Sequence, residues 1–472
     1  MLARFFGNGA RLIGAVAVTT TLAATPQQGA AETLTDAMAG AYNTSGLLDQ
    51  NRALLRAADE DVAIAVSALR PILNFVGNYT PTYNKSRTAL GTTTLRSNPI
   101  FLGISLDLLL FDGGASRLGV EAAKETVLST RQSLLSIEQS VLIRAVAAYM
   151  NVVLQLENVS LRENNVRLLD EELRATQDRF EVGEVTRTDV ALAESRLAAA
   201  RSNLASARGG LVNARSEYVN AVGREAGDLE ARPRLPTAPA SVDAAVAVAV
   251  RNHPDILSAQ FRVAAADLLV QQAAAAYGPT VTLNGDVGVT ENPDIVNYNR
   301  NASIGLVLSQ SIYSGGRLAA QTRRAQANGD AARGALLTAR KDIVQSVEDA
   351  FARLRVANAN LESTAERIRA AQVAFDGIRE EATLGARTTI DVLTAEQDLL
   401  DAQTRQIEAT AEQYVAAYQL LQAQGLLTAE RLGLPVQIYD PVAYYNLAET
   451  APARLSQQGQ ELDRVLKALG KQ

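Results

Sequence analysis

The side chains best suited to chemistry are scarce in this sequence. Its 472 residues include one histidine, His253, and no cysteine. His253 stands in the triplet Asn252-His253-Pro254 at a predicted helix start, where we expect a capping or turn role, and one imidazole cannot build an ordinary zinc site. The same context argues against a Ser-His-Asp arrangement, and Gly7-Asn8-Gly9 follows no strand and forms no nucleotide loop. We therefore expect no enzyme, no catalytic residue, no metal and no cofactor.

Two threonine–aspartate pairs have the spacing of helix caps. Residues Thr186–Asp189 and Thr388–Asp391 follow the pattern Thr-x-x-Asp shortly after Gly183 and Gly385. With this spacing the threonine hydroxyl accepts a hydrogen bond from the aspartate N–H, and the carboxylate accepts one from the threonine N–H. We expect a capped helix after each glycine turn.

The composition indicates long helices. The chain is 47% hydrophobic but only 5% aromatic, and Ala, Leu, Arg, Glu and Gln dominate long stretches. Its net charge of −6 comes from interleaved acidic and basic residues, so the basic face of a nucleic-acid-binding protein is missing. We expect no nucleic-acid partner.

The N-terminus has the form of a secretory signal peptide. Arg4 and Arg11 precede the apolar stretch Leu12–Ala24, and the small residues Gly29–Ala31 follow it. The apolar stretch is too short to cross a bilayer, which takes about 20 residues, and no later segment is interpreted as a transmembrane helix. We expect cleavage after Ala31 and export of the mature chain.

The chain is a tandem duplication. Phe111–Gly114 recurs as Tyr313–Gly316, and Val182–Val190 recurs as Leu384–Val392, both displaced by 202 residues. A proline-rich stretch lies between the halves and cannot continue a helix. The predicted division is a signal peptide (1–31), a first repeat (32–226), a linker (227–240), a second repeat (241–433) and a C-terminal tail (434–472). Whether the tail packs on the protein or is disordered stays open.

Each repeat is predicted to contain two strands that lead into a long helix. Apolar and polar residues alternate with the period of a strand, although the run 106–111 alternates less cleanly. A polar loop is expected at 87–97. The predicted strands span about 71–85, 99–111, 279–290 and 302–313, and the glycine pairs Gly113, Gly114, Gly315 and Gly316 are predicted strand-to-helix turns.

After each glycine pair the apolar period becomes seven, which is a coiled-coil signal. Gly113 and Gly183 are separated by 70 residues, as are Gly315 and Gly385, which makes each outgoing helix roughly 100 Å long at about 1.5 Å per residue. A second heptad helix follows each turn. Each half is therefore predicted to form a coiled-coil hairpin with its tip near Gly183 or Gly385.

Strands of this length with one apolar face suit a membrane β-barrel. Four strands in one chain are too few to close a barrel, so the chain must associate with copies of itself. Two copies give about eight strands and three give about twelve, and a water-filled lumen favours three or more. The predicted fold class is mainly α with a membrane β part.

The duplicated order of elements, the motif Leu110–Gly114 and the paired segments 182–190 and 384–392 resemble the TolC-type outer-membrane factors of Gram-negative bacteria. The resemblance covers roughly residues 33–440. It implies a homotrimer in the cell outer membrane, in contact with outer-membrane lipid. Three chains would build a 12-stranded β-barrel and a 12-helix periplasmic tunnel, which a periplasmic adaptor (membrane fusion protein) connects to an inner-membrane transporter.

The resemblance also implies a gate at the hairpin tips. Asp391 matches a position where the family places an aspartate ring across the pore. The negative charge of such a ring would attract cations, and mutual repulsion would raise the pKa of some of its members. The position of a second ring is Thr394 here, so a weaker cation site is expected.

Arg387 matches a position that ties the moving hairpin to its neighbour through Thr188 and Asp189. The aromatic partner of this contact is replaced by Ala382 in this sequence. Half of the contact is therefore expected to be missing.

Two alternative functions stay open. A secreted coiled-coil structural or adaptor protein would have no pore and would be extracted without detergent. The resemblance implies an exit duct that passes substrates from the inner-membrane pump through the periplasm and the outer membrane. Drug efflux and type I secretion of proteins both stay open as its role, because the pump that selects the substrate lies outside this sequence.

Overall fold

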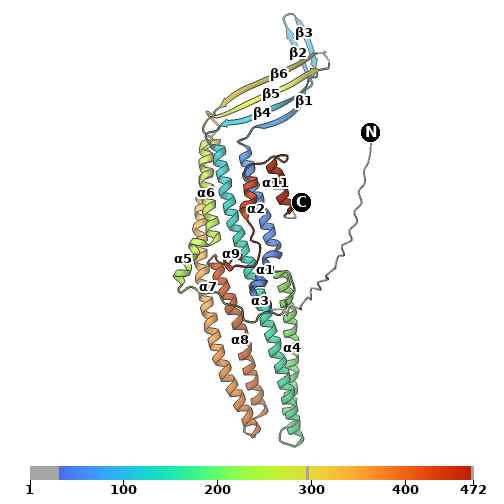
Figure 1. Ribbon diagram of the computed structural model, residues 1–472, viewed down its shortest axis with the longest axis vertical. Coiled ribbons are helices and arrows are strands. Elements are labelled where there is room, and N and C mark those ends of the chain that lie inside the picture. Colours follow the sequence, from blue (N-terminus) through green and yellow to red (C-terminus); the bar gives the residue numbers. More distant parts are fainter. Residues whose placement is uncertain (1–30, 294–296, 469–472) are drawn as a thin grey trace, which may run out of the picture.

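The computed structural model describes residues 31–293 and 297–468, so the predicted signal peptide lies outside the described residues except for Ala31. The molecule is elongated, with long helices bundled side by side and a twisted β-sheet at one end (Figure 1). The fold is mainly helical, as predicted.

The main sheet joins the two halves of the chain. Its strands are β1 (Ile72–Tyr79), β4 (Ile100–Phe111), β5 (Thr280–Asn292) and β6 (Asn297–Ser309). They are antiparallel in the order β1-β4-β5-β6, so β4 of the first half pairs directly with β5 of the second. Strands β1 and β6 form the two edges.

One face of this sheet is apolar, as the alternation predicted. The pairing places Phe75 opposite Ile104, and Ile104 opposite Val287. The register shifts between Leu109 and Phe111, which accounts for the weaker alternation of residues 106–111. The apolar face carries Leu73, Phe75, Leu102, Ile104, Leu106, Leu108, Val281, Leu283, Val287, Val289, Ile304, Leu306 and Leu308.

The expected polar loop at 87–97 is wrong, because this segment belongs to a second β-hairpin. Strands β2 (Thr82–Thr88) and β3 (Gly91–Ser97) pair with each other and extend the first hairpin away from the helices (Figure 1). The predicted strand at 71–85 is divided near Pro81, since proline cannot donate a hydrogen bond to the ladder. Threonines are frequent in both strands and favour β structure without being apolar. The sequence analysis therefore interpreted a polar strand segment as a loop.

Two helices of 67 residues run most of the length of the molecule. Helices α3 (Ala115–Glu181) and α7 (Arg317–Thr383) each span about 100 Å at about 1.5 Å per residue. Each starts after a glycine pair with positive φ, between +61° and +86°. This conformation favours glycine and explains the pairs as strand-to-helix turns.

Each long helix forms an antiparallel hairpin with a shorter one. Helix α4 (Arg187–Val222) returns along α3, and α8 (Thr389–Ala423) returns along α7 (Figure 1). Beyond the ends of these return helices, α2 (Gly46–Ser67) and α6 (Pro254–Ala275) pack beside α3 and α7 up to the sheet. The short helices α1 (Leu34–Thr44) and α5 (Val242–Asn252) pack near the middle.

The largest apolar core lies where α1, α2, α3 and α4 meet. Tyr149 and Tyr218 are fully buried there, and the Tyr149 hydroxyl donates to the carbonyls of Glu32 at 2.8 Å and Glu230 at 2.9 Å. Helix α3 is also the one described helix with a stretch long and apolar enough to cross a membrane. Most of that stretch is buried inside the chain, so it is a core segment of the bundle.

The C-terminal tail packs on the bundle within the described residues. It contains α10 (Pro441–Ala448) and α11 (Gln457–Ala468), and the short helix α9 (Ala429–Leu432) ends just before it. The Tyr444 hydroxyl donates to Glu60 of α2 at 2.6 Å, and Arg70 donates to the Ala451 carbonyl at 2.8 Å. The tail therefore lies along α2 between the middle of the molecule and the sheet (Figure 1).

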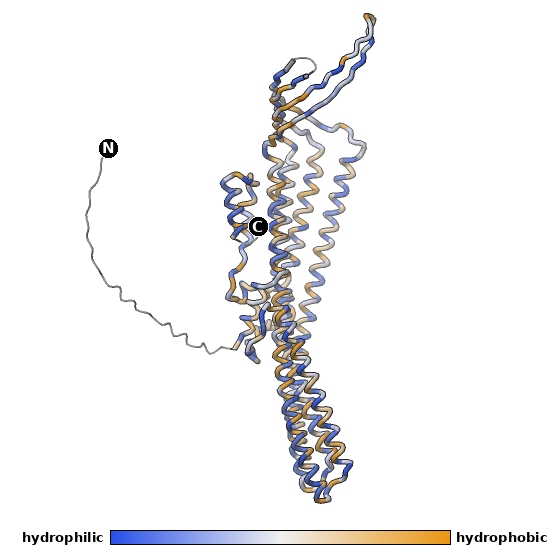
Figure 2. Tube along the Cα trace, turned by 90° about the vertical axis from the view of Figure 1, so that its right-hand side faces the viewer, coloured by the Kyte–Doolittle hydropathy of each residue, from blue (hydrophilic) through white to orange (hydrophobic). Residues whose placement is uncertain are grey.

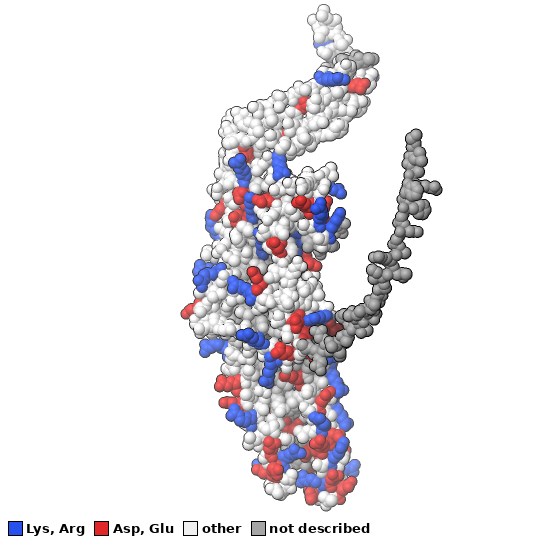
Figure 3. Space-filling view, viewed as in Figure 1, with Lys and Arg blue, Asp and Glu red and all other residues white. Residues whose placement is uncertain are grey.

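Charge is distributed unevenly along the molecule. Charged side chains crowd the free ends of the two hairpins, whereas the visible face of the sheet carries few (Figure 3). Hydrophobic and hydrophilic residues are mixed along the hairpins (Figure 2). The two ends of the rod are thus suited to different surroundings, an apolar one at the sheet and water at the hairpin tips.

Candidate functional site at the hairpin tips

The free ends of both hairpins have the same turn geometry. Gly183 and Gly385 have φ of +83° and +77°, and their N–H groups donate to Phe180 and Ala382, each at 3.1 Å. The N–H groups of the following residues, Glu184 and Ala386, donate to the carbonyls of Arg179 and Glu381, both at 2.9 Å. Such bonds satisfy the last carbonyls of a helix when a left-handed residue ends it. Substituting either glycine would strain the turn.

Both predicted capping boxes are confirmed. The Asp391 carboxylate accepts from the Thr388 N–H at 3.0 Å and from its hydroxyl at 2.8 Å, and the Asp391 N–H donates back at 3.3 Å. The corresponding distances for Asp189 and Thr186 are 2.8, 2.7 and 3.3 Å. Helices α8 and α4 therefore begin with the same cap, one in each repeat.

These caps favour the ionised form of the two aspartates. Bonds from the Thr388 N–H and hydroxyl, with a smaller contribution from Arg387, lower the pKa of Asp391. The Thr186 hydroxyl and N–H likewise lower the pKa of Asp189. Both carboxylates are therefore anionic in a single chain. A raised pKa from repulsion in a ring depends on several chains and stays a prediction.

Arg387 is engaged within its own hairpin. Its Nε donates to Glu381 Oε2 at 2.7 Å across the glycine turn, and this carboxylate raises the pKa of Arg387. Within the described part of one chain, no hydrogen bond joins Arg387 to Thr188 or Asp189. The expected contact between chains stays a prediction, and it would compete with Glu381, a partner that the sequence analysis missed.

The remaining predicted gate positions are small or neutral. The Thr394 hydroxyl donates to the Ile390 carbonyl at 2.7 Å inside α8. Ala382 is buried with Phe375 and Val392 in a cluster of the α7–α8 hairpin. The small residue at 382 therefore packs inside its own hairpin.

The two hairpins contact each other just above their tips. Leu393 of α8 packs with Leu169 of α3, and Leu168 of α3 packs against the α7–α8 cluster. Asn165 of α3 donates a hydrogen bond to Glu396 of α8 at the same level. The sequence analysis missed this pair, because nothing in the local pattern shows which polar residue faces the other hairpin.

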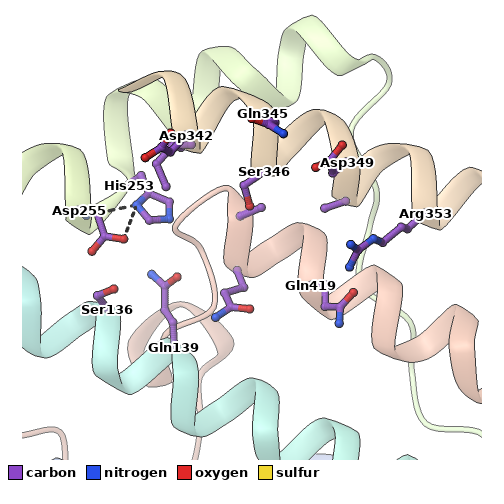
Figure 4. Close-up of a pocket in the computed structure, with 14 residues that line it drawn as sticks. Ser136, Gln139, His253, Asp255, Asp342, Gln345, Ser346, Asp349, Arg353 and Gln419 are labelled. Atoms are coloured by element: carbon purple, nitrogen blue, oxygen red, sulfur yellow. Dashed lines mark hydrogen bonds and ion pairs between the residues drawn. The ribbon is translucent and has the colours of Figure 1, made fainter. Parts of the chain in front are cut away.

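A cavity of about 590 Å³ lies where α8 ends and α6 begins, between α3 and α7. His253 borders it, and its Nδ1 accepts from the Asp255 N–H at 3.2 Å, which confirms the predicted cap of α6 (Figure 4). Burial lowers the pKa of His253. In residues 31–293 and 297–468, no hydrogen bond joins His253 to a serine, and no cluster of three metal-binding side chains occurs. The cavity has polar walls but no nucleophile paired with a base.

Comparison with known proteins shows the family to which this chain belongs. The chain matches the family described as outer membrane efflux protein twice, at residues 41–224 and 245–426. It is 36% identical to the outer membrane efflux protein BepC of Brucella suis biovar 1 (strain 1330), over 92% of this chain and 94% of that protein. It is 25% identical to the outer membrane protein TolC of Salmonella enteritidis, over 41% of this chain and 42% of that one.

The fold is similar to that of solved outer-membrane channels. The Campylobacter jejuni CmeC outer membrane channel aligns with a TM-score of 0.74 at 16% identity, covering 89% of this chain and 90% of that one. At this identity the likeness concerns the fold. The two family matches together include both long hairpins and all four strands of the main sheet.

Proposed function

Because the chain belongs to the outer membrane efflux protein family, and is therefore an outer-membrane exit duct that extends into the periplasm, we propose that three copies assemble into one continuous channel. The family and its relatives are transport channels, so the alternative of a secreted coiled-coil protein without a pore is not favoured. Assembly, gate and partners are the steps that the proposal adds.

The four-stranded sheet with two open edges carries the proposal. Its edges β1 and β6 have no outer neighbour among the described strands. Its apolar face is exposed, with Phe75 at 77%, Ile304 at 75% and Leu308 at 70%. An open edge and a bare apolar face are both unfavourable in a monomer. Pairing β6 of one copy with β1 of the next removes the edges and turns the apolar face toward lipid.

The opposite face of the sheet suits a water-filled lumen. Asn284 donates to Asp107 at 2.7 Å, and Asn301 donates to Asp286 at 2.8 Å. Three copies give about twelve strands, which is wide enough for an aqueous lumen, whereas the eight strands of two copies would be filled by side chains. The trimer is therefore the assembly that conducts.

The hairpins form the periplasmic part of the duct in this proposal. Their exposed charged surfaces and free ends would contact a periplasmic adaptor, which connects the duct to an inner-membrane transporter. Three Asp391 carboxylates would line the entrance and bind cations, Thr394 adds no second acidic ring, and Arg387 would exchange Glu381 for Thr188 and Asp189 of a neighbour.

We propose efflux of small compounds as the transport role. The supporting observation is that BepC, which is named an efflux protein, matches nearly the whole chain. Deleting the gene should then increase sensitivity to toxic compounds and leave the profile of secreted proteins unchanged. Loss of one secreted protein with unchanged sensitivity would instead assign the duct to type I secretion.

The proposal is tested on detergent-extracted full-length protein. Light scattering should give the mass of three chains, and the protein should conduct ions in a planar lipid bilayer. A water-soluble monomer or dimer without conductance would contradict it.

A further inference from the structure

The seam between the two hairpins contains one buried carboxyl group that the proposed gate does not use. Glu396 of α8 is only 7% exposed and Asn165 of α3 only 6%. The neighbouring buried residues of α8, Leu393 and Leu399, are apolar. An ionised carboxyl group in such a place costs far more free energy than a protonated, hydrogen-bonded one.

The side chains around Glu396 offer it little compensation for lost water. Among the described residues, only Asn165 donates a hydrogen bond to the Glu396 carboxyl group. Arg162 of α3 and Arg196 of α4 attract the ionised form, whereas Asp401 of α8 repels it. Helix α7 faces the seam with apolar side chains such as Phe375. Burial raises the pKa of Glu396 to about 7, because it outweighs the arginines and the Asn165 hydrogen bond, which favour the ionised form.

This pair lies next to the proposed entrance. Glu396 follows Asp391 by five residues on the same helix, a rise of about 7.5 Å at about 1.5 Å per residue. Its partner belongs to the other hairpin, so any movement of α7–α8 away from α3–α4 must break the Asn165 bond and admit water. The burial lies inside one chain and does not depend on how copies assemble.

We propose that Glu396 and Asn165 form a proton-dependent latch that holds the two hairpins of each chain together beside the entrance. The proposal rests on the function proposed above. Protonated Glu396 keeps the seam closed, and its ionisation favours separation of the hairpins and an open entrance. The ligand of this site is therefore the proton.

The direction of the pH effect follows from linkage. The pKa of Glu396 is about 7 in the packed seam and would return to its ordinary value, 4.5, once water reaches it. Between these values the closed state binds one more proton than the open state, so closure weakens as the pH rises. The equilibrium shifts by up to tenfold per pH unit for each chain. The stabilisation of the closed seam by Glu396 is complete below pH 4.5 and is lost above about pH 7.

Single-channel recording of the purified assembly tests the latch. The open fraction of the wild-type channel should increase from about pH 5 to about pH 8. Glu396→Gln keeps the shape and the Asn165 bond but cannot ionise, so its open fraction should stay low and independent of pH. Glu408→Gln, at an exposed position of the same helix, should respond like the wild type.

The outcomes separate the latch from the duct. A Glu396→Gln channel that keeps the wild-type pH response would overturn the latch, and so would a wild-type channel with no pH response. A preparation with no conductance at any pH would instead count against the proposed duct.

A second readout measures the hairpin tips directly. The chain has no cysteine, so a spin label on Leu384→Cys is unique in each copy. Distances between labels should increase with pH in the Glu396 background and remain constant in the Glu396→Gln background. Equal pH-dependent distances in both backgrounds would refute the latch even if the conductance were altered.

Discussion

Replacing Asp59 with asparagine should stabilise the protein at neutral and alkaline pH. Asp59 of α2 is completely buried, and neither carboxylate oxygen has a hydrogen-bond partner in the described residues. Burial raises its pKa from 3.8 to about 7, and Arg131 offsets only part of this effect. The native state therefore disfavours the charge that Asp59 carries at alkaline pH.

The expected magnitude follows from this pKa. A rise from 3.8 to about 7 corresponds to about 4 kcal/mol between the two protonation states. The native state binds one more proton than the unfolded state between these pH values, so wild-type stability falls as the pH rises through this window. Asparagine has no such charge. Local relaxation reduces the difference, and we expect Asp59→Asn to gain about 2 kcal/mol at pH 8 and almost nothing at pH 4.

Thermal unfolding followed by far-UV circular dichroism measures this effect. At one fixed scan rate, the Tm of Asp59→Asn should exceed that of the wild type by a few degrees at pH 8 and coincide with it near pH 4. Asp61→Asn, at an exposed position of the same helix, is the matched control and should follow the wild type. A lower Tm of Asp59→Asn than of the wild type at pH 8 would show that Asp59 is ionised and paired with Arg131. It would refute the conclusion that its burial destabilises the protein at this pH.

Three further predictions concern the duct. Asp391→Asn keeps an oxygen that can cap α8 but removes the charge, so block of single-channel current by divalent cations should weaken at least tenfold, and unchanged block would exclude a cation site at the entrance. Arg387→Ala removes the proposed contact with Thr188 and Asp189 of a neighbouring copy and should increase the open fraction of the channel; an unchanged open fraction would limit Arg387 to its ion pair with Glu381 within the turn. Leu306→Arg places a charge on the apolar face of β6, where it should cost about 2–4 kcal/mol in the membrane and reduce the amount of assembled protein in the outer membrane, whereas normal assembly would show that this face does not contact lipid.

Sequence patterns predicted the elements that depend on short-range interactions. The strand alternation, the heptads and the Thr-x-x-Asp spacing each depend on residues a few positions apart, and the structure confirms the apolar face of the sheet and both caps. Repetition strengthened these predictions, because each motif occurs twice at the same displacement. The polar β2–β3 hairpin was missed because its side chains bury no apolar face, and alternation of apolar residues was the signal used for strands.

Contacts between distant segments were decided by tertiary structure alone. The sequence placed Glu396 on a coiled-coil helix but could not show that it turns toward Asn165, which lies 231 positions earlier. Likewise, the tail could be assigned to α2 only from its packing, where Tyr444 meets Glu60. A heptad fixes which side chains share a face of a helix, whereas the neighbour that covers this face depends on the path of the whole chain. The sequence thus determined the long helices, the strands of the main sheet and their turns, and the fold determined which buried carboxyl groups have a hydrogen-bond partner.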